Sequence, residues 1–323
     1  MKAVIRHRYG PLSSVQFGDV PVPVPGEGEI LIRVHATTVN RTDLGVVTGK
    51  PLAFRLFVGV PQPRYIVLGT DLAGEVVKTG KSVTNYTPGD KVFAFNDNGL
   101  PSQAEYCCLP SNSPNLSKMP EEVDFLTAAA SLEGPHYARN FLRAAGVKKG
   151  QRVLVHGATG GIGSAAVQLL IHYGVRVTAT APTDHLDTVR ALGPERVIDW
   201  QVEELKDAGR NFDFVFDTVG KSSYGYCKPL LGAYGAYLSS ELGPRNENPF
   251  LALAGLLRNG RRVIFPLPQD ISGTLSLMRE LLASGVYQPL IDRTYPLSDA
   301  ADAYGYVATG QKTGNVVLQV SKG

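Results

Sequence analysis

Glycines that follow a short apolar run give the first indication of chemistry in this chain. Residues 153–155 are Val-Leu-Val, glycines recur between residues 157 and 163, and apolar residues at helical spacing continue to Leu170. This pattern predicts a strand, a tight turn and a helix. The free N–H groups and the dipole at such a helix start favour a pyrophosphate. The segment therefore indicates a dinucleotide site and hydride-transfer chemistry; a tight turn without a ligand is the alternative.

Two registers of the glycine fingerprint are possible in this turn. The first, Ala158-x-Gly160-x-x-Gly163, starts where the strand is expected to end. The second, Gly161-x-Gly163-x-x-Ala166, starts too deep in the helix, so we prefer the first. In that register Gly160 allows the backbone to approach the phosphates, and Gly163 allows close packing of helix and strand. The residues expected to line the phosphate site are Ala158, Thr159, Gly160, Gly161 and Ile162.

The next strand, residues 175–181, indicates which dinucleotide is bound. NAD-specific folds place an Asp or Glu at the end of this strand, where it holds the ribose hydroxyls. Here Thr180 stands at that point. Because a carboxylate would repel a 2′-phosphate and none is present, we expect NADPH. Thr183 can donate a hydrogen bond to the phosphate and His185 could add positive charge, although His185 fits a solvated first-turn position equally well.

Length and composition limit the class of protein. The chain has 323 residues, 43% of them hydrophobic, three cysteines and a formal net charge of +3. This length suggests two domains with real cores. The modest charge gives no indication of a nucleic-acid or membrane partner, and no run reaches the length of a membrane helix. The cysteines do not suggest a disulfide framework and the N-terminus is not a signal peptide, so we expect a cytoplasmic protein.

The elements that position the glycine turn follow a change of pattern near residue 120. Strand signals dominate before it, with short strands expected at 29–34, 74–77, 91–95 and 105–109. Afterwards helical spacing runs over 121–142, broken near Gly134-Pro135, and strands and helices then alternate. This alternation predicts an α/β fold with a parallel sheet. Residues 51–65, which include Phe54, Leu56 and Phe57, form a long apolar loop that could wall a substrate site or pack at a subunit edge.

Several short blocks occur in a fixed order along the chain. They are Val39-Asn-Arg-Thr-Asp43, Gly69-Thr-Asp-Leu-Ala-Gly74, Gly89-Asp-Lys-Val92, the glycine turn, Ala191-Leu-Gly-x-x-x-Val-Ile-Asp199 and Thr313-Gly-Asn-Val-Val317. Together they resemble the medium-chain dehydrogenase/reductase superfamily and, within it, the zinc-free quinone oxidoreductase (zeta-crystallin-like) branch. The resemblance implies a GroES-like catalytic domain built from 1–120 and 263–323, a Rossmann NADP-binding domain at 121–262, and a homodimer.

The resemblance also bears on metal binding. Zinc-using relatives have a Cys where this chain has Asn40, and His then Glu where it has Thr70 and Asp71. An amide and a hydroxyl are poor substitutes for a thiolate and an imidazole. The six histidines show no ligand spacing. We therefore expect no metal.

Site residues follow from the resemblance. It implies that Asn40 lies beside the nicotinamide and offers an amide donor, although Asn is also a common turn residue after a strand. Tyr65 is a candidate proton donor or substrate contact. The resemblance also implies coenzyme contacts at strand ends that match the ribose and nicotinamide rim, and at one position in the tail. These residues are Val219, Gly220, Ser239, Leu267 and Asn315. The alternative role of Asn315 is to open a strand after Gly314.

The chemistry that remains without a metal is restricted. A simple ketone concentrates charge on one oxygen, whereas a quinone or an enone spreads it over a conjugated system. We therefore expect an NADPH-dependent oxidoreductase that reduces quinones or activated C=C bonds. A zinc-type alcohol or aldehyde reductase and a non-catalytic NADPH-binding redox sensor are the alternatives. Tyr224-x-x-x-Lys228 matches the short-chain dehydrogenase pair, but it follows the glycine turn too soon.

Overall fold

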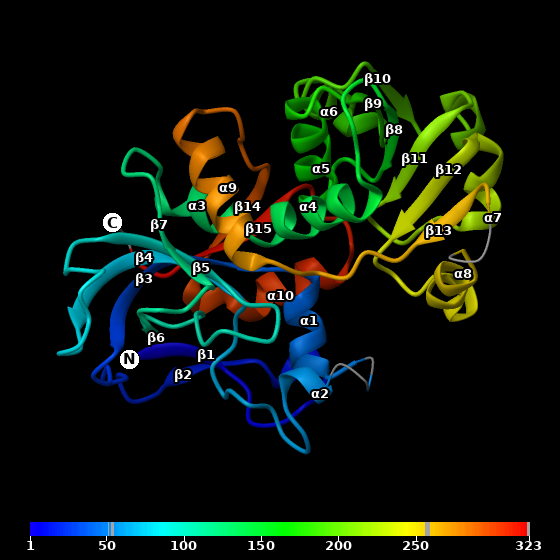
Figure 1. Cartoon of the computed structure of the whole chain (residues 1–323). Helices are drawn as coiled ribbons and strands as arrows, with labels where there is room; N and C mark the ends of the chain where they lie inside the picture. Colours follow the sequence, from blue (N-terminus) through cyan, green and yellow to red (C-terminus); the bar gives the residue numbers. More distant parts are fainter. Residues whose placement is uncertain (51, 53–54, 256–258, 322–323) are drawn as a thin grey trace. The chain divides into compact units, whose positions relative to one another are not determined.

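The computed structural model describes residues 1–50, 52, 55–255 and 259–321, which form two compact units (Figure 1). The first unit joins Met1–Glu133 to Asp270–Gly323, and the second is Gly134–Gln269. The domain limits expected from the sequence, after residues 120 and 262, stay predictions of where the functional domains divide. Within the described residues, no helix is long and apolar enough to cross a membrane.

A seven-stranded sheet forms the body of the first unit. Its strands are β3 (Glu29–Val39), β4 (Asp71–Thr79), β5 (Lys91–Phe95), β6 (Tyr106–Pro110), β7 (Leu116–Lys118), β14 (Ile291–Pro296) and β15 (Asn315–Gln319). The order is β14-β15-β3-β4-β5-β7, and β6 also pairs with β3. β1 (Lys2–Ile5) and β2 (Gln16–Asp19) form a separate antiparallel pair. Because β15 pairs with β3, the end of the chain completes a sheet that its beginning starts.

Helices of the first unit are α1 (Arg41–Thr48), α2 (Arg55–Val58), α3 (Phe125–Ala130), α9 (Ile271–Ala283) and α10 (Ala300–Ala308). Val47 of α1 and Tyr304 of α10 are buried in one core with Val316 of β15. The expectation of a loop over 51–65 is corrected by α2, whose Val58 is buried in the same core while Leu56 and Phe57 are exposed. Pro51 and Phe54 lie outside the described residues.

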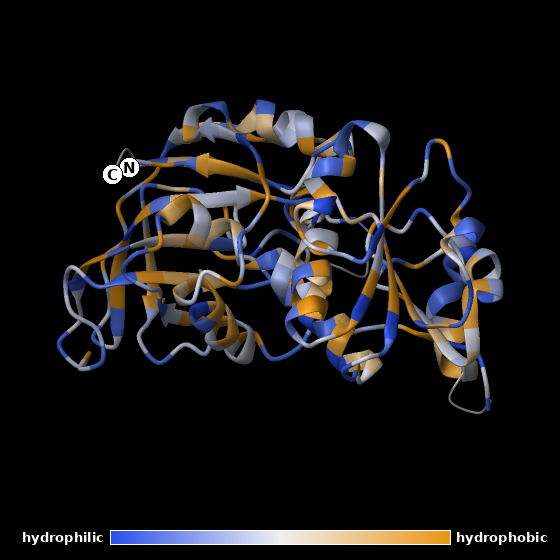
Figure 2. Cartoon of the chain, turned by 90° about the horizontal axis from the view of Figure 1, so that it is seen from above, coloured by the Kyte–Doolittle hydropathy of each residue, from blue (hydrophilic) through white to orange (hydrophobic). Residues whose placement is uncertain are grey.

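A six-stranded parallel sheet forms the second unit. Its strands are β8 (Arg152–His156), β9 (Arg176–Ala181), β10 (Arg196–Asp199), β11 (Phe212–Asp217), β12 (Leu231–Ser239) and β13 (Arg262–Ile264), and its helices are α4 (Glu133–Ala145), α5 (Gly161–His172), α6 (Leu186–Arg190), α7 (Tyr224–Cys227) and α8 (Glu247–Gly255). Residues 153–155 are fully buried, as expected for a parallel strand covered on both faces. Hydrophobic residues follow the strands of this sheet (Figure 2).

The strand order of the second unit locates its ligand edge. The order is β10-β9-β8-β11-β12-β13, so the direction of winding reverses between β8 and β11. Doubly wound sheets bind ligands at the carboxyl ends of the strands beside such a reversal. The expected α/β class with a parallel sheet is confirmed, and the glycine turn leaves β8 at this edge.

One predicted break is misplaced. The sequence suggested that the helical pattern over 121–142 is broken near Gly134-Pro135, but α3 ends at Ala130 and α4 begins at Glu133. The Ser131 hydroxyl donates to the Thr127 carbonyl oxygen at 2.6 Å, which helps to close α3. Pro135 lies in the first turn of α4, where a missing N–H costs no intrahelical hydrogen bond.

Candidate functional site

The glycine turn begins one residue earlier than the sequence suggested. Gly157 follows β8 directly and has a φ of +88°, a conformation that favours glycine. A Cβ at this position would also lie 2.5 Å from a methyl group of Val219. The sequence analysis did not include Gly157 in the site, because the preferred register of the glycine fingerprint started at Ala158. Its place directly after the apolar strand was the available signal.

The start of α5 leaves backbone donors for a ligand. Gly160 is the N-cap of α5 and makes no side-chain capping hydrogen bond. A helix without such a cap has unsatisfied N–H groups in its first turn. A Cβ on Gly160 would come no closer to another heavy atom than 3.7 Å, to the Gly157 oxygen. The space beside Gly160 is therefore open to a ligand.

Close packing behind the turn explains a second glycine. A Cβ on Gly163 would lie 2.1 Å from the Gly157 oxygen and 2.8 Å from Thr218 Oγ1. The Thr218 hydroxyl donates to the His156 carbonyl oxygen at 2.8 Å. A Cβ on Gly134 would lie 2.6 Å from the Gly161 oxygen, so α4 also abuts the start of α5. Because α5 begins at Gly161, the alternative glycine register would lie wholly inside the helix.

Thr180 serves the turn itself. Its side chain is fully buried, and Oγ1 accepts from the Gly157 N–H at 3.1 Å and lies 3.0 Å from His156 Nδ1. The Ala158 N–H donates to the Thr180 carbonyl oxygen at 3.1 Å. Burial lowers the pKa of His156, which favours the neutral imidazole. Thr180, which stands where NAD-specific folds have the acid that holds the ribose, thus points into the protein.

A carboxylate from the neighbouring strand lies beside the end of β9. The Thr183 hydroxyl donates to Asp199 Oδ2 at 2.5 Å, and the Thr183 N–H donates to Gln201 Oε1 at 2.9 Å. Thr183 and His185 form a short 3-10 turn, η3 (Thr183–His185), ahead of α6. Helix α6 then runs over Leu186–Arg190. Asp199 is 16 residues from Thr183 in sequence, and no local pattern indicates their contact.

The loop after β11 is ordered by one buried acid. Asp217 accepts from the N–H groups of Gly220 at 2.8 Å and Ser222 at 3.0 Å, and from the Tyr237 hydroxyl at 2.8 Å. Gly220 has a φ of +67°. Val219 and Gly220 thus stand at the carboxyl edge beside the glycine turn. Ser239 is buried at the end of β12, and Leu267, after β13, is 60% exposed.

In the first unit Asn40 is a helix cap. Its Oδ1 accepts from the Asp43 N–H at 3.0 Å, while Asp43 Oδ2 accepts from the Asn40 N–H at 2.9 Å, which completes a capping box. Asn40 Nδ2 donates to the hydroxyl oxygens of Thr38 at 3.3 Å and Thr70 at 3.2 Å. Asp43, in the first turn of α1, is thus the reciprocal partner of the Asn40 cap, and the amide of Asn40 is occupied by the same network.

Two buried carboxyl groups lie in this network. Asp71 accepts from the Thr38 N–H at 2.7 Å and from its hydroxyl at 2.5 Å. Burial raises the pKa of Asp71 to about 7, against the lowering effect of these hydrogen bonds. Burial, with a contribution from the charge of Asp71, raises the pKa of Asp43 well above its usual range. Burial also raises the pKa of Glu133, whose Oε1 accepts from the Thr42 hydroxyl at 2.7 Å.

Tyr65 and Asn315 are the other predicted residues of the first unit. Tyr65 is 38% exposed and lines a small cavity with Arg6, Gly69 and Asn98. The Asn315 side chain donates to the Leu290 carbonyl oxygen at 2.9 Å, as the backbone N–H of Asn315 does at 2.8 Å. Asn315 therefore opens β15 and fixes it to the preceding loop.

No candidate metal centre occurs in the described part of the chain. Among the described residues, no three His, Cys, Asp or Glu side chains are grouped so that they could hold a metal ion. At the position that the resemblance associates with zinc, Asn40 and Thr70 form a hydrogen bond with each other. Thr70 also donates to Asp43 Oδ1 at 3.4 Å. These side chains satisfy one another through hydrogen bonds.

Comparison with known proteins identifies the family. Over 339 aligned residues the chain is 32% identical to the chloroplastic quinone-oxidoreductase QR1 of Triphysaria versicolor, covering 99% of this chain and 98% of the relative. The chain belongs to the medium-chain dehydrogenase/reductase superfamily, in its quinone oxidoreductase branch. This medium-chain dehydrogenase/reductase matches family models for an alcohol dehydrogenase GroES-like domain at residues 26–123 and a zinc-binding dehydrogenase at 192–318.

Further relatives of this medium-chain dehydrogenase/reductase span almost all of its length. It is 30% identical over 331 residues to the chloroplastic NADPH-dependent alkenal/one oxidoreductase of Arabidopsis thaliana, covering 98% of this chain and 79% of the relative. The solved quinone oxidoreductase of Coxiella burnetii superposes with a TM-score of 0.84 at 27% identity, covering 99% of both chains. The expected fold, a GroES-like β-rich domain with a Rossmann sheet, is confirmed.

Proposed function

We propose that this chain is an NADPH-dependent oxidoreductase that reduces quinones or the activated C=C bonds of enones without zinc. The observation that carries the proposal is the turn between β8 and α5. It combines a positive φ at Gly157, open space beside Gly160 and an uncapped helix start. Such a turn fits a pyrophosphate. Relatives named as quinone oxidoreductase and as NADPH-dependent alkenal/one oxidoreductase support the same reaction class.

The residues present fit a dinucleotide in two respects. The peptide groups of residues 158–162 would hold the pyrophosphate, since the first turn of α5 lacks a side-chain cap. Val219 and Gly220, held by Asp217, lie in the loop after β11, the neighbour of β8, at the same carboxyl edge, where a doubly wound sheet receives the rest of such a ligand. When bound, NADPH supplies a hydride. The residues of this chain would bind NADPH, orient it and exclude water from it.

The side chains at the expected metal position support the proposed independence from zinc. Asn40 and Thr70 offer an amide and a hydroxyl, which bind zinc poorly, and both belong to the hydrogen-bond network around Asp43. An acceptor that spreads negative charge through a conjugated system needs less Lewis-acid help than a ketone. Quinones and enones have that property. They are therefore the acceptor class we propose.

Candidate residues for the acceptor side come from the first unit. We keep Tyr65 as a candidate proton donor because its phenol is partly exposed beside a small cavity. Asn40 stays a candidate for the nicotinamide neighbourhood, and its tight network would keep it rigid there. Asn315 and Leu267 stay predictions for the coenzyme rim, as do Ser239, Thr180, Thr183 and His185.

Steady-state oxidation of NADPH over a panel of quinones and enones tests the proposal. We expect turnover on at least one of these classes and none on simple ketones or primary alcohols. Tight NADPH binding without turnover on any acceptor would favour a redox sensor. Stoichiometric zinc in the purified protein, coupled to alcohol oxidation, would favour a zinc-type reductase.

Assembly and location are proposed separately. A homodimer in the cytoplasm is the expectation from the sequence and the family resemblance. Light scattering coupled to gel filtration measures the oligomeric state, and a mass of about 35 kDa for the 34.7 kDa chain would exclude the dimer. Fractionation of cells that produce the protein tests the location.

A further inference from the structure

We propose that Asp199 supplies, from β10, the ribose-edge carboxylate that β9 lacks, and that it limits the preference of this chain for NADPH over NADH. The inference rests on the proposed coenzyme site at the glycine turn and deepens it. Rossmann sheets read the adenosine ribose with an acid at the end of the second strand. In this sheet that strand is β9, which ends at Ala181 without an acid.

The sheet register brings Asp199 to that point. β9 and β10 are parallel neighbours, and Asp199 pairs directly with Ala181. The Asp199 side chain is fixed there by two hydrogen bonds, from the Thr183 hydroxyl to Oδ2 at 2.5 Å and from the Gln201 N–H to Oδ1 at 3.0 Å. A carboxylate therefore stands beside the end of β9, although it comes from the next strand along.

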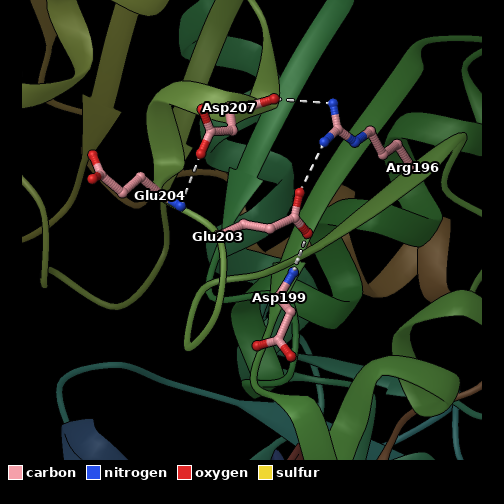
Figure 3. A network of polar contacts seen from close by, with 5 residues as sticks. All are labelled: Arg196, Asp199, Glu203, Glu204 and Asp207. Carbon is pink, nitrogen blue, oxygen red and sulfur yellow. Dashed lines mark hydrogen bonds and ion pairs between the residues drawn. The ribbon is translucent and has the colours of Figure 1, made fainter.

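Within the described ranges, hydrogen bonds rather than an ion pair balance the charge of this carboxylate. In the same loop Glu203 forms an ion pair with Arg196 at 3.0 Å, and Glu203 Oε1 accepts from the Asp199 N–H at 3.2 Å. The Asp199 carboxylate is turned away from that pair (Figure 3). None of the described cations forms an ion pair with it, and the residue is only 7% exposed. A partly buried charge is screened less by water and salt than an exposed one.

Two consequences for the coenzyme follow from this placement. First, each Asp199 oxygen keeps a lone pair that can accept from a ribose hydroxyl, which suits NADH. Second, a 2′-phosphate at the end of β9 would meet a like charge and would find the Thr183 hydroxyl already donating to Asp199. Thr183 was expected to bind the phosphate. Its hydroxyl instead holds the residue that opposes the phosphate.

Calorimetric dissociation constants for NADPH and NADH test the inference in the full-length protein. D199N keeps the size of the side chain and removes its charge, so we expect the affinity ratio of NADPH to NADH to rise about tenfold at low salt. The gain should shrink as salt screens the repulsion. E203Q is the matched control, because it removes a carboxylate of the same loop that Arg196 already neutralises. We expect it to change the ratio less than twofold. D199S repeats the charge removal should D199N fail to fold.

Each outcome separates the two proposals. A wild-type protein that binds NADPH, with the same affinity ratio in D199N, would overturn this inference and leave the proposed function intact. An equal gain in E203Q would also overturn it, because the effect would then belong to the general charge of the loop. A wild-type protein that binds neither coenzyme would overturn the proposed function itself.

Discussion

Gly160→Ala separates coenzyme binding from folding. Gly160 has φ −74° and ψ 165°, which alanine adopts without strain. The added methyl would lie 3.7 Å from the Gly157 oxygen, an ordinary contact distance. The folded protein therefore has room for it. Because alanine is a poorer N-cap than glycine, we expect the free energy of unfolding to fall by less than about 1 kcal/mol.

The same methyl should obstruct a pyrophosphate. It would stand where the backbone must approach the phosphates closely, so we expect the dissociation constant of NADPH to rise at least about tenfold, or about 1.4 kcal/mol. Calorimetry measures this. The emission of Trp200 gives a second titration, since it is the single tryptophan, is 50% exposed and follows Asp199 at the same sheet edge.

Gly163→Ala is the contrasting variant. Its methyl would lie 2.1 Å from the Gly157 oxygen, so backbone must move, and we expect a loss of about 3 kcal/mol of folding free energy. If Gly160→Ala instead keeps both the wild-type melting temperature and wild-type affinity for NADPH, the turn is not where the phosphates bind, and the proposed function loses its basis.

Three further predictions concern the first unit. Asn40→Ala should lower the free energy of unfolding by about 1 kcal/mol in denaturant titrations, whereas Asn40→Ser keeps a capping oxygen and should recover most of it; equal losses would contradict the capping role. The folded pKa of Asp71, about 7, exceeds its ordinary 3.8, so the folded state binds the extra proton between these values. Stability should therefore fall as pH rises from about 4 to about 7 and level off above it, and Asp71→Asn should flatten that slope; a wild-type profile without the slope would contradict the shift. Tyr65→Phe should lower kcat at least about tenfold with little change in KM if the phenol delivers a proton, and an unchanged kcat would exclude that role.

Local patterns in the sequence were sufficient to predict the frame of the nucleotide-binding unit. The apolar run at 153–155 and the helical spacing after the glycines correspond to β8 and α5. Lys91–Phe95 was predicted with the bounds that it has. Such patterns succeed where burial repeats with the period of the element. Helix α2 was missed, since it is short and lies between strand signals.

The polar details depended on contacts between distant residues. Nothing near Thr183 in sequence indicates that its hydroxyl meets Asp199, because the contact arises from the pairing of β9 with β10. Asn40 looked free to offer its amide, but Asp43, Thr38 and Thr70 occupy it once β3, β4 and α1 come together. Residue types predicted the class of chemistry, whereas the strand register determined which groups remain available for it.

The pairing of β15 with β3 sets an order for assembly on the ribosome. Every strand of the parallel sheet lies between residues 152 and 264, so that unit can be completed while the last part of the chain is still being synthesised. The seven-stranded sheet of the first unit began earlier, but β3 gains its neighbour β15 only after residues 315–319 emerge. The part of the protein that is translated first is thus finished last. On the edge of β3 opposite β4, β6 can pair early with residues 29–33, but residues 36–39 must wait for β15, open to strand-mediated aggregation, for nearly the whole of translation.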